Sequence, residues 1–296
     1  MQTYAISDQL TRKYLDSFMI RPEYIGSAAA DTSAEYFGEV YQSPVMISTL
    51  SGMERVHEGG NVLLAQAADL TGTLDWNGVL PVEQGLAILK QGTRAVLSSK
   101  PIADMDAVCD MIRTYEQAGA KAFVMDVDFI FDPATGCVRN HPSFGQMATK
   151  GEAELKRMSE CSSLPIIIKG VLSAHDAVIC RDAGVKAIVV SHHMGMIDSA
   201  VPPVSVIGEI REAVGNDLVI FADCGIRSGS DAFKALVLGA DGVLIGRPLM
   251  EPFKDGPEKV AEYLNRITNE LRFCMSITGS PDLKHLNRRA LVRKDF

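Results

Sequence analysis

The stretch FADCGIRSGSD at residues 221–231, followed by GADGVLIGR at residues 239–247, decides the fold. Two apolar runs, LVIFAD and GVLIG, are each followed by glycine and an arginine, and a helix-length segment separates them. Glycine lets backbone N–H groups approach an anion, and arginine offers a planar fork of donors. The pattern predicts two parallel strands whose carboxyl ends share one phosphate group, as the last two strands of many eight-fold βα barrels do.

Short apolar runs alternate with amphipathic helical segments through most of the chain, which predicts a parallel sheet built from βα units. The runs expected to form strands are residues 45–49, 72–76, 95–98, 122–127, 165–169, 187–191, 218–223 and 242–245. The segments expected to form helices are residues 58–69, 82–89, 104–118, 152–159, 174–183, 204–213, 230–238 and 257–278. Eight consecutive pairs favour an α/β fold of the closed (β/α)8 TIM barrel type. The alternative, an open doubly wound sheet, lacks the GxGxxG motif after its first strand.

The length and composition of the chain are typical of a soluble globular protein. It has 296 residues, of which 47% are hydrophobic and 22% are charged. This length allows two average domains, but single α/β barrels of about 250 residues are common. We therefore expect one domain, with residues 1–40 as an N-terminal extension packed on the barrel and residues 41–296 as the barrel itself.

Charge, hydropathy and cysteine spacing argue against several classes of function. The net charge of −8 disfavours nucleic acid or an anionic membrane as a partner. No apolar run approaches the roughly 20 residues that span a bilayer, and the N-terminal sequence has no apolar signal segment. The six cysteines are scattered without a CxxC pair, which indicates reduced thiols rather than disulfides or a zinc site. We expect a cytoplasmic protein.

Two further motifs place chemically useful side chains at expected strand ends. The run PIIIKG ends in Lys169, which is either a cation at the barrel mouth or the start of an exposed turn. Because the phosphate loops lie nearby, we favour a ligand-facing lysine. The run SHHMG holds His192 and His193, and histidine suits proton transfer near neutral pH. Adjacent residues of an extended segment point in opposite directions, so at most one histidine faces the mouth, unless both are loop residues without a task.

A third cluster ends the fourth expected strand with two acids. Asp126 and Asp128 are two residues apart and share one face of a strand, so they either reach the mouth or cap the next turn. No metal is expected, because neighbouring histidines rarely chelate one ion. Cys224, inside the glycine loop, is interpreted as a small residue rather than a reactive thiol. The long loop at residues 129–149 follows this strand and is a candidate lid.

Taken together, these segments resemble the FMN-dependent 2-hydroxy acid oxidase and dehydrogenase family, which includes glycolate and lactate oxidases. The run LPIIIKGVLSAHDA resembles the lysine strand of that family and its following helix. The run SHHMG resembles the SNHGG signature, and ADCGIRSGSDAFKALVLGADGVLIGRP resembles the long flavin-phosphate motif. Type 2 isopentenyl diphosphate isomerases share the phosphate loops but lack an SNH-like histidine.

The resemblance implies FMN as the cofactor and a role for each matching residue. Lys169 matches the lysine beside the N1/O2 edge of the flavin, and His193 matches the base that takes the substrate hydroxyl proton. Ser191 matches a serine near the ring. The residues that match ribityl and phosphate contacts are Asp223, Gly225, Arg227, Gly246 and Arg247. Leu50 and Ser51 fall near the first-strand stretch whose backbone approaches the flavin.

The sequence departs from the family at the positions that bind the substrate there. The arginine that follows SNHGG and pairs with the substrate carboxylate is replaced by Met196, and residues 129–135 contain no counterpart of a second such arginine. The FQLY motif, which supplies a flavin-contacting glutamine and a substrate-contacting tyrosine, reads VLSS at residues 96–99. Asp126 stands where a threonine usually meets the flavin, and Asp128 belongs to the implied substrate pocket. The usual N-terminal helices are largely missing.

These departures bear on the substrate. A carboxylate entering a partly dry pocket is costly unless arginines pair with it, so a small 2-hydroxy acid should bind poorly. We expect an FMN-dependent oxidoreductase that oxidises another alcohol-type substrate, a 2-hydroxy acid derivative included, by His193-assisted hydride transfer to flavin N5. The alternatives are a non-redox FMN-dependent isomerase and a degenerate barrel that binds FMN or phosphate without oxidase activity. The electron acceptor stays open among oxygen, a quinone and a partner protein, and the resemblance implies a homo-oligomer, a tetramer in many relatives.

Overall fold

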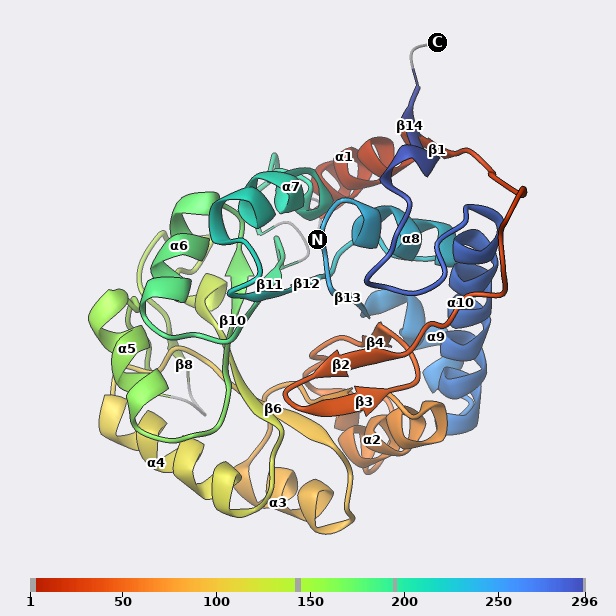
Figure 1. The fold of residues 1–296 in the computed structure, drawn as a ribbon. Helices are drawn as coiled ribbons and strands as arrows, with labels where there is room; N and C mark the ends of the chain where they lie inside the picture. The colour runs from red at the N-terminus through yellow and green to blue at the C-terminus, as the bar shows by residue number, and fades with distance from the viewer. Residues whose placement is uncertain (1–3, 142–144, 194–195, 295–296) are drawn as a thin grey trace.

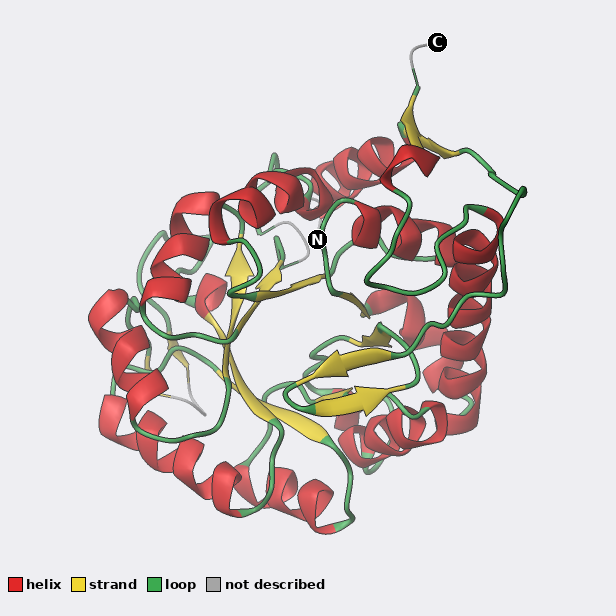
Figure 2. Ribbon diagram, in the orientation of Figure 1, coloured by secondary structure: helices red, strands yellow, loops and turns green. Residues whose placement is uncertain are grey.

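The computed structural model describes residues 4–141, 145–193 and 196–294, and it shows a ring of parallel strands enclosed by helices (Figures 1 and 2). In chain order the strands are β4 (Val45–Ile47), β5 (Asp75–Trp76), β6 (Ala95–Ser99), β7 (Ala122–Asp126), β10 (Ile166–Val171), β11 (Ala187–Val190), β12 (Val219–Ala222) and β13 (Gly242–Ile245). Their order in the sheet is β4-β13-β12-β11-β10-β7-β6-β5. A parallel bridge between Leu50 and Asn77 joins the segments that follow β4 and β5, and so closes the ring. The expected single-domain (β/α)8 barrel is confirmed.

The outer layer consists of the expected helices. They are α2 (Gly60–Thr71), α3 (Val82–Lys90), α4 (Met105–Gln117), α5 (Glu152–Glu160), α6 (Ala174–Asp182), α7 (Pro203–Val214), α8 (Gly229–Val237) and α10 (Pro257–Ile277), with a short α9 (Met250–Phe253) before the last. The side chains of Asp104, Ser173 and Ser228 cap three of these helices at their amino ends. The second strand is shorter than expected, because Gly72 has a φ of 64° and forms the left-handed cap of α2.

Period-two alternation determines which side chains enter the barrel. Four members of the buried cluster inside the barrel are Val124, Ile167, Val189 and Phe221. The residue two positions further along each strand also faces the barrel axis, at or just beyond the carboxyl end. Those four residues are Asp126, Lys169, Ser191 and Asp223. Four neighbouring strand ends therefore present polar side chains at one mouth of the barrel.

The opposite end of the barrel is closed by a hairpin of β2 (Ala34–Tyr36) and β3 (Glu39–Tyr41), which lies across the ring in Figure 1. The ring of Tyr36 meets the ring of Phe221 edge-on at 5.0 Å, and its hydroxyl donates a hydrogen bond of 2.8 Å to the carbonyl of Asp241. The ring of Trp76 also packs edge-on against the ring of Phe221, with the ring centres 4.8 Å apart. These rings form a dry floor beneath the polar mouth.

The N-terminal segment packs on the outside of the barrel. Helix α1 (Tyr4–Asp16) lies beside α7, and the strand after it, β1 (Phe18–Ile20), pairs antiparallel with β14 (Leu291–Arg293) near the other end of the chain (Figure 1). The boundary expected at residue 41 stays a prediction. No helix in the described part of the chain is long and apolar enough to cross a lipid bilayer.

The loop after β7 folds back on itself. An antiparallel bridge joins Phe131 to Val138, and β8 (Asn140–His141) pairs with β9 (Gly145–Gln146). A further bridge ties Met147 to Ile102, in the loop after β6. Residues 142–144, part of the candidate lid, lie outside the described residues, and the lid function stays a prediction.

Candidate active site at the barrel mouth

Lys169 lies at the centre of the mouth, buried at the end of β10. Its Nζ is 3.4 Å from Oδ1 of Asp126 on β7 and 3.8 Å from Oδ2 of Asp223 after β12. Burial alone lowers the pKa of a lysine, but the carboxylates of Asp126, Asp223 and Asp128 raise the pKa of Lys169 well above its usual value. Lys169 is therefore a permanent cation in the mouth.

A second buried lysine, Lys100, shares Asp126 with Lys169. Lys100 Nζ donates a hydrogen bond of 2.6 Å to Asp126 Oδ2 and lies 4.2 Å from the centre of the Phe129 ring. Burial raises the pKa of an aspartate, but Lys169 and Lys100 hold the pKa of Asp126 well below its usual range. The sequence analysis missed Lys100. The alternation of Val96, Ser98 and Lys100 along β6 is the signal that places it in the mouth.

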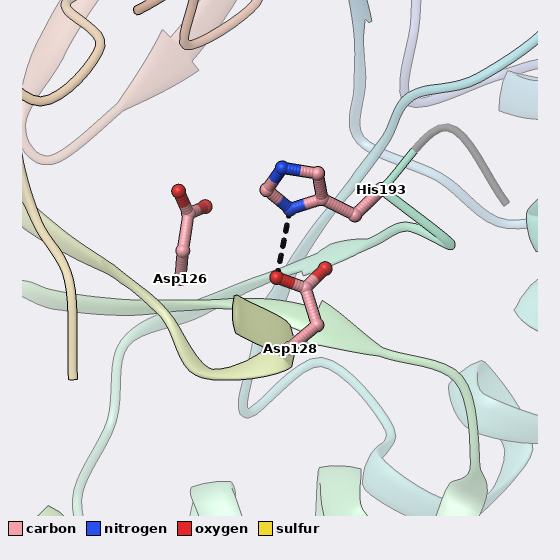
Figure 3. Close-up of side chains that lie close together, drawn as sticks. All are labelled: Asp126, Asp128 and His193. Atoms are coloured by element: carbon pink, nitrogen blue, oxygen red, sulfur yellow. Dashed lines mark hydrogen bonds and ion pairs between the residues drawn. The ribbon is translucent and has the colours of Figure 1, made fainter. Parts of the chain in front are cut away.

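His193 faces the mouth and is held by Asp128. Its Nδ1 lies 2.8 Å from Asp128 Oδ1 (Figure 3), and its backbone N–H donates to Ser191 Oγ at 3.1 Å. Phe129 stacks on the imidazole, with the ring centres 5.9 Å apart. His193 has a φ of 44°, a left-handed conformation that a non-glycine residue rarely adopts. Such strain persists where the surroundings hold it, and here a carboxylate and an aromatic ring hold the imidazole while a hydroxyl holds the backbone N–H.

Gly170 allows Asp128 to reach this position. It lies at a register shift of β10 between Lys169 and Val171, with a φ of 102°. A Cβ added at Gly170 would lie 2.6 Å from the Cβ of Asp128. The short helical turn Val127–Phe129 therefore rests directly on the backbone of β10, and Asp128 is brought beside the imidazole.

The two adjacent histidines point to different sides. His192 is buried against the N-terminal helix, where its Nε2 lies 3.1 Å from Thr11 Oγ1, and burial lowers its pKa. His193 alone of this pair contacts Asp128 at the mouth. Met194 and Gly195, the remainder of the SHHMG motif, lie outside the described residues.

Asp126, Asp128 and His193 offer three atoms within 4.8 Å of one another, which is a spacing that a metal ion could use (Figure 3). The surrounding charge opposes a cation there. One oxygen of Asp126 is hydrogen-bonded to Lys100, and the other faces Lys169. Two ammonium groups beside one carboxylate make this cluster a charge-paired acid–base site, and the absence of a metal stays a prediction.

The phosphate loops lie against α1. Cys224 and Gly225 both have positive φ, of 65° and 87°, and turn the chain after Asp223. Both terminal nitrogens of Arg247 bind the carboxylate of Asp8, each at 2.6 Å. Arg227 lines a cavity of about 630 Å³ that runs along α1 and that Asp8 also lines. The sequence analysis anticipated neither α1 nor its carboxylate at these arginines.

Leu50 and Ser51 lie at the seam where the barrel closes. A Cβ added at Gly78 would lie 2.1 Å from the carbonyl oxygen of Leu50, so the two backbones cross in direct contact. Ser51 Oγ accepts a hydrogen bond of 3.0 Å from the backbone of Val79. The side chain of Leu50 lies next to Gly246, 3.6 Å from the Cβ that Gly246 lacks. These residues thus adjoin the end of β13.

One arginine does reach this region from the loop after β7. The Arg139 guanidinium stacks over the Phe129 ring at 4.2 Å. It donates to the carbonyl of Phe131 at 3.1 Å and lies 3.4 Å from the carboxylate of Asp132. The comparison of residues 129–135 alone missed it, because the hairpin returns Arg139 to the site from further along the chain. Met196, which is partly buried, carries no charge at the position of the implied arginine.

Buried polar atoms that lack a hydrogen bond at the mouth test whether a flavin fits. Among the described residues, Ser98 Oγ, Asp126 Oδ1 and Asp128 Oδ2 are buried and have no hydrogen-bond partner. They come from β6, from β7 and from the turn after β7, next to Lys169 on β10. Buried polar atoms normally find partners, so a ligand rich in hydrogen-bonding groups suits this face. An isoalloxazine ring is such a ligand, because its N3–H is a donor for a carboxylate oxygen and its carbonyl oxygens are acceptors for the Ser98 hydroxyl.

Comparison with known proteins agrees with this chemistry. The model of the family described as FMN-dependent dehydrogenase matches residues 5–141 and 138–293. An L-lactate oxidase of Lactobacillus jensenii is 30% identical over 88% of this chain and 72% of its own length. A solved mandelate oxidase superposes with a TM-score of 0.85 at 28% identity, covering 98% of this chain and 90% of that one.

A second solved structure matches this chain over the same span. It is a mandelate oxidase in which an arginine is replaced by leucine, solved with 2-hydroxy-phenylacetamide. It is 27% identical to this chain with a TM-score of 0.84, and the match covers 98% of this chain and 90% of that one. The fold, the buried lysine, the partly buried histidine and these matches lead to one conclusion. The chain belongs to the FMN-dependent dehydrogenase family and is an FMN-dependent oxidoreductase of alcohol-type substrates.

Proposed function

We propose that the protein oxidises an uncharged 2-hydroxy acid derivative, such as an amide or ester, rather than a free 2-hydroxy acid. The carrying observation is the balance of charge at the mouth. Three carboxylates, Asp126, Asp128 and Asp223, face two ammonium groups, Lys100 and Lys169. A substrate carboxylate would add a further negative charge to a partly dry site that already has an excess of acid.

The arginines near the mouth do not reverse this balance. The resemblance implies a carboxylate-binding arginine at Met196, where this chain has a thioether. Arg139 is within reach of Phe129, but Asp132 offsets its charge. The mandelate oxidase with an arginine-to-leucine change was solved with an uncharged amide. A relative with the same fold has thus been crystallised with a neutral ligand of the class proposed here, which supports the proposal.

The proposed chemistry assigns His193 as the general base. With its Nδ1–H donating to Asp128, the imidazole keeps the lone pair of Nε2 for the substrate hydroxyl proton. Asp128 fixes this tautomer and favours the imidazolium that forms when the proton is taken. Gly170 contributes by letting Asp128 rest on β10.

The remaining site residues hold the cofactor. FMN, when bound, accepts the two electrons that leave the substrate carbon. Lys169 is the cation proposed to offset the charge that the ring then carries, with Ser98, Ser191 and Asp126 as polar contacts around the ring. The residues proposed for the ribityl and phosphate groups and for the adjoining backbone are Asp223, Gly225, Arg227, Gly246, Arg247, Leu50 and Ser51.

Anaerobic reduction of the bound flavin tests the substrate class. We expect mandelamide and methyl mandelate to bleach the visible absorbance of the holoenzyme faster than mandelate, lactate or glycolate. Met196→Arg should shift the preference toward the free acids, because a guanidinium pairs with a carboxylate. Met196→Gln, which is uncharged, is the matched control.

Two outcomes would count against this function. Faster bleaching by mandelate than by mandelamide in the wild-type protein would reverse the predicted preference. A flavin that stays oxidised with every member of a wide substrate panel would instead favour the isomerase or the binding-only alternative.

A further inference from the structure

Helix α1 lies over the loops that follow β11, β12 and β13. Ser7 Oγ donates to the carbonyls of Ile197 and Asp198, each at 2.9 Å. Thr11 contacts His192 at 3.1 Å, and Asp8 binds Arg247. Every one of these contacts joins the N-terminal helix to a segment at the cofactor end of the barrel.

The pair between Asp8 and Arg247 has the geometry that a phosphate would use. Nη1 and Nη2 of Arg247 each donate to a different oxygen of Asp8 at 2.6 Å, which is a bidentate fork. Carboxylate and phosphate groups both accept a bidentate pair of hydrogen bonds from the planar guanidinium, and they use the same two nitrogens. Asp8 therefore occupies two of the donors of the arginine that directly follows Gly246, in the flavin-phosphate motif.

The other strong contact of α1 leaves the phosphate loop undisturbed. Arg12 binds both oxygens of Asp231, at 2.7 and 3.0 Å, and the same carboxylate accepts the backbone N–H of Arg227 at 3.1 Å. Arg12 thus supports the loop without covering the donors of Arg247. A cavity of about 630 Å³ lies beside α1 and is lined by Asp8 and Arg227 among others.

Resting on the assignment of Arg247 to the FMN phosphate in the proposed function, we propose that Asp8 is an internal competitor of that phosphate, so that α1 is a latch which the phosphate group opens. A phosphate placed at Arg247 meets the negative charge of Asp8 and takes over its two donors. The amino-terminal part of α1 then moves away from the loop, while Arg12 keeps the carboxyl-terminal part attached. The affinity for FMN is then set by how much more strongly Arg247 binds the phosphate than it binds Asp8.

A comparison of FMN with riboflavin tests the competition, because riboflavin lacks the phosphate. Apoprotein prepared from the holoenzyme is titrated with each flavin and followed by quenching of flavin fluorescence. We expect Asp8→Asn to bind FMN about tenfold more tightly than the wild type, the scale of one lost charge-assisted contact. Riboflavin affinity should change by less than about twofold.

Asp16→Asn is the matched control for a change of charge. Asp16 lies on the same helix and lines the same cavity, but it pairs with Arg12 at 2.8 Å and not with Arg247. We expect this variant to leave FMN affinity within about twofold of the wild type. Equal tightening by both variants would show a general charge effect and would overturn the latch.

Two further results would overturn the proposal. Weaker FMN binding by Asp8→Asn would mean that Asp8 orients Arg247 for the phosphate instead of competing with it. Hydrogen–deuterium exchange supplies an independent readout. We expect FMN, but not riboflavin, to speed exchange at the amides of residues 4–10, and protection of those amides by FMN would contradict opening of α1.

Discussion

Asp126 is the residue that most distinguishes this mouth. The resemblance implies a neutral threonine there, and an isolated acid would oppose a negatively charged ring. The structure instead places the acid between two buried ammonium groups, one from β6 and one from β10. The negative charge of the acid and the positive charge of Lys100 offset each other. Asp126 therefore does not oppose a negatively charged ring as an isolated acid would.

This pairing makes the reduction potential of the bound flavin sensitive to each partner. Asp126→Thr leaves Lys100 and Lys169 unbalanced, so the anionic reduced ring is favoured and the midpoint potential should rise by about 30 mV, or about 1.4 kcal/mol for two electrons. Lys100→Met removes one cation and should lower the potential. Spectroelectrochemical titration of the holoenzymes measures both shifts.

The double variant, Asp126→Thr with Lys100→Met, is the control. It removes the pair together, so its potential should return close to that of the wild type. It also avoids leaving an unpaired buried charge, which would destabilise the fold. Identical potentials in all four proteins would show that the pair does not act on the ring.

Single residues were predictable where they end an apolar run. Lys169 and Asp223 each follow buried strand residues, and alternation carries them to the mouth. Lys100 escaped prediction because the sequence suggested that the strand ends two residues earlier, and because a proline follows Lys100 directly. Asp8 escaped because nothing local to a carboxylate on a helix indicates an arginine 239 residues away.

At the scale of elements, the bulge in β10 is the feature on which the acid–base pair depends. The strand register shifts at Gly170, and the turn after β7 fills the space that its missing side chain leaves. Any side chain there meets Asp128 and requires a strained φ of 102°.

Gly170→Ala should therefore damage catalysis more than cofactor binding. We expect Asp128 to be pushed from the imidazole and turnover to fall about a hundredfold, the usual worth of a positioned general base. Gly92→Ala is the matched control, because Gly92 also has a positive φ, 87°, but a Cβ added there meets nothing within 4 Å. Steady-state rates as a function of pH, with FMN affinity measured alongside, make the comparison. Equal loss in both variants would reduce the effect to backbone strain.

The regular elements of the barrel were predictable because each rests on its own local pattern. Eight apolar runs and eight amphipathic segments appear in the structure with shifts of a few residues, the largest at β5. The β2–β3 hairpin was not foreseen. Its strands have three residues each, and its turn uses Phe37 with a φ of 52°, where hairpin signals normally place Asn or Asp. Its place is fixed by packing of Tyr36 on Phe221, a contact between distant parts of the chain.

For the whole molecule, we expect stability to depend on pH through one residue near the seam where β4 meets β5. Beside that seam Asp75 is fully buried and hydrogen-bonded to Asn77, with its second oxygen unpaired among the described residues. Burial, and then the charge of Asp69, raise the pKa of Asp75 to about 8. The folded protein therefore keeps this carboxyl protonated near neutral pH, which the unfolded chain does not.

This difference predicts a loss of stability as pH rises. The folded state binds one more proton than the unfolded state between 3.8, the ordinary aspartate value, and about 8, so the free energy of unfolding falls across that window. Asp75→Asn is always neutral and should remove this fall. We expect it to exceed the wild type by a few kcal/mol at about pH 8.5 and by much less near pH 5.

Urea unfolding at several pH values measures the effect. Asp110→Asn, at an exposed carboxylate on α4, is the control and should leave the pH dependence unchanged. A wild-type stability that rises between pH 5 and 8.5, or a variant that follows the same slope, would contradict a buried proton at Asp75.

The aromatic floor beneath the mouth has a consequence for traffic. Tyr36, Trp76 and Phe221 seal the far end of the barrel, so molecules that reach Lys169 arrive and depart on the side of His193. The reductant and the oxidant of the catalytic cycle then use the same opening of the barrel, one after the other. Such alternation would appear as parallel double-reciprocal plots. A substitution that widens this opening would alter the rates of both the reductive and the oxidative half-reaction.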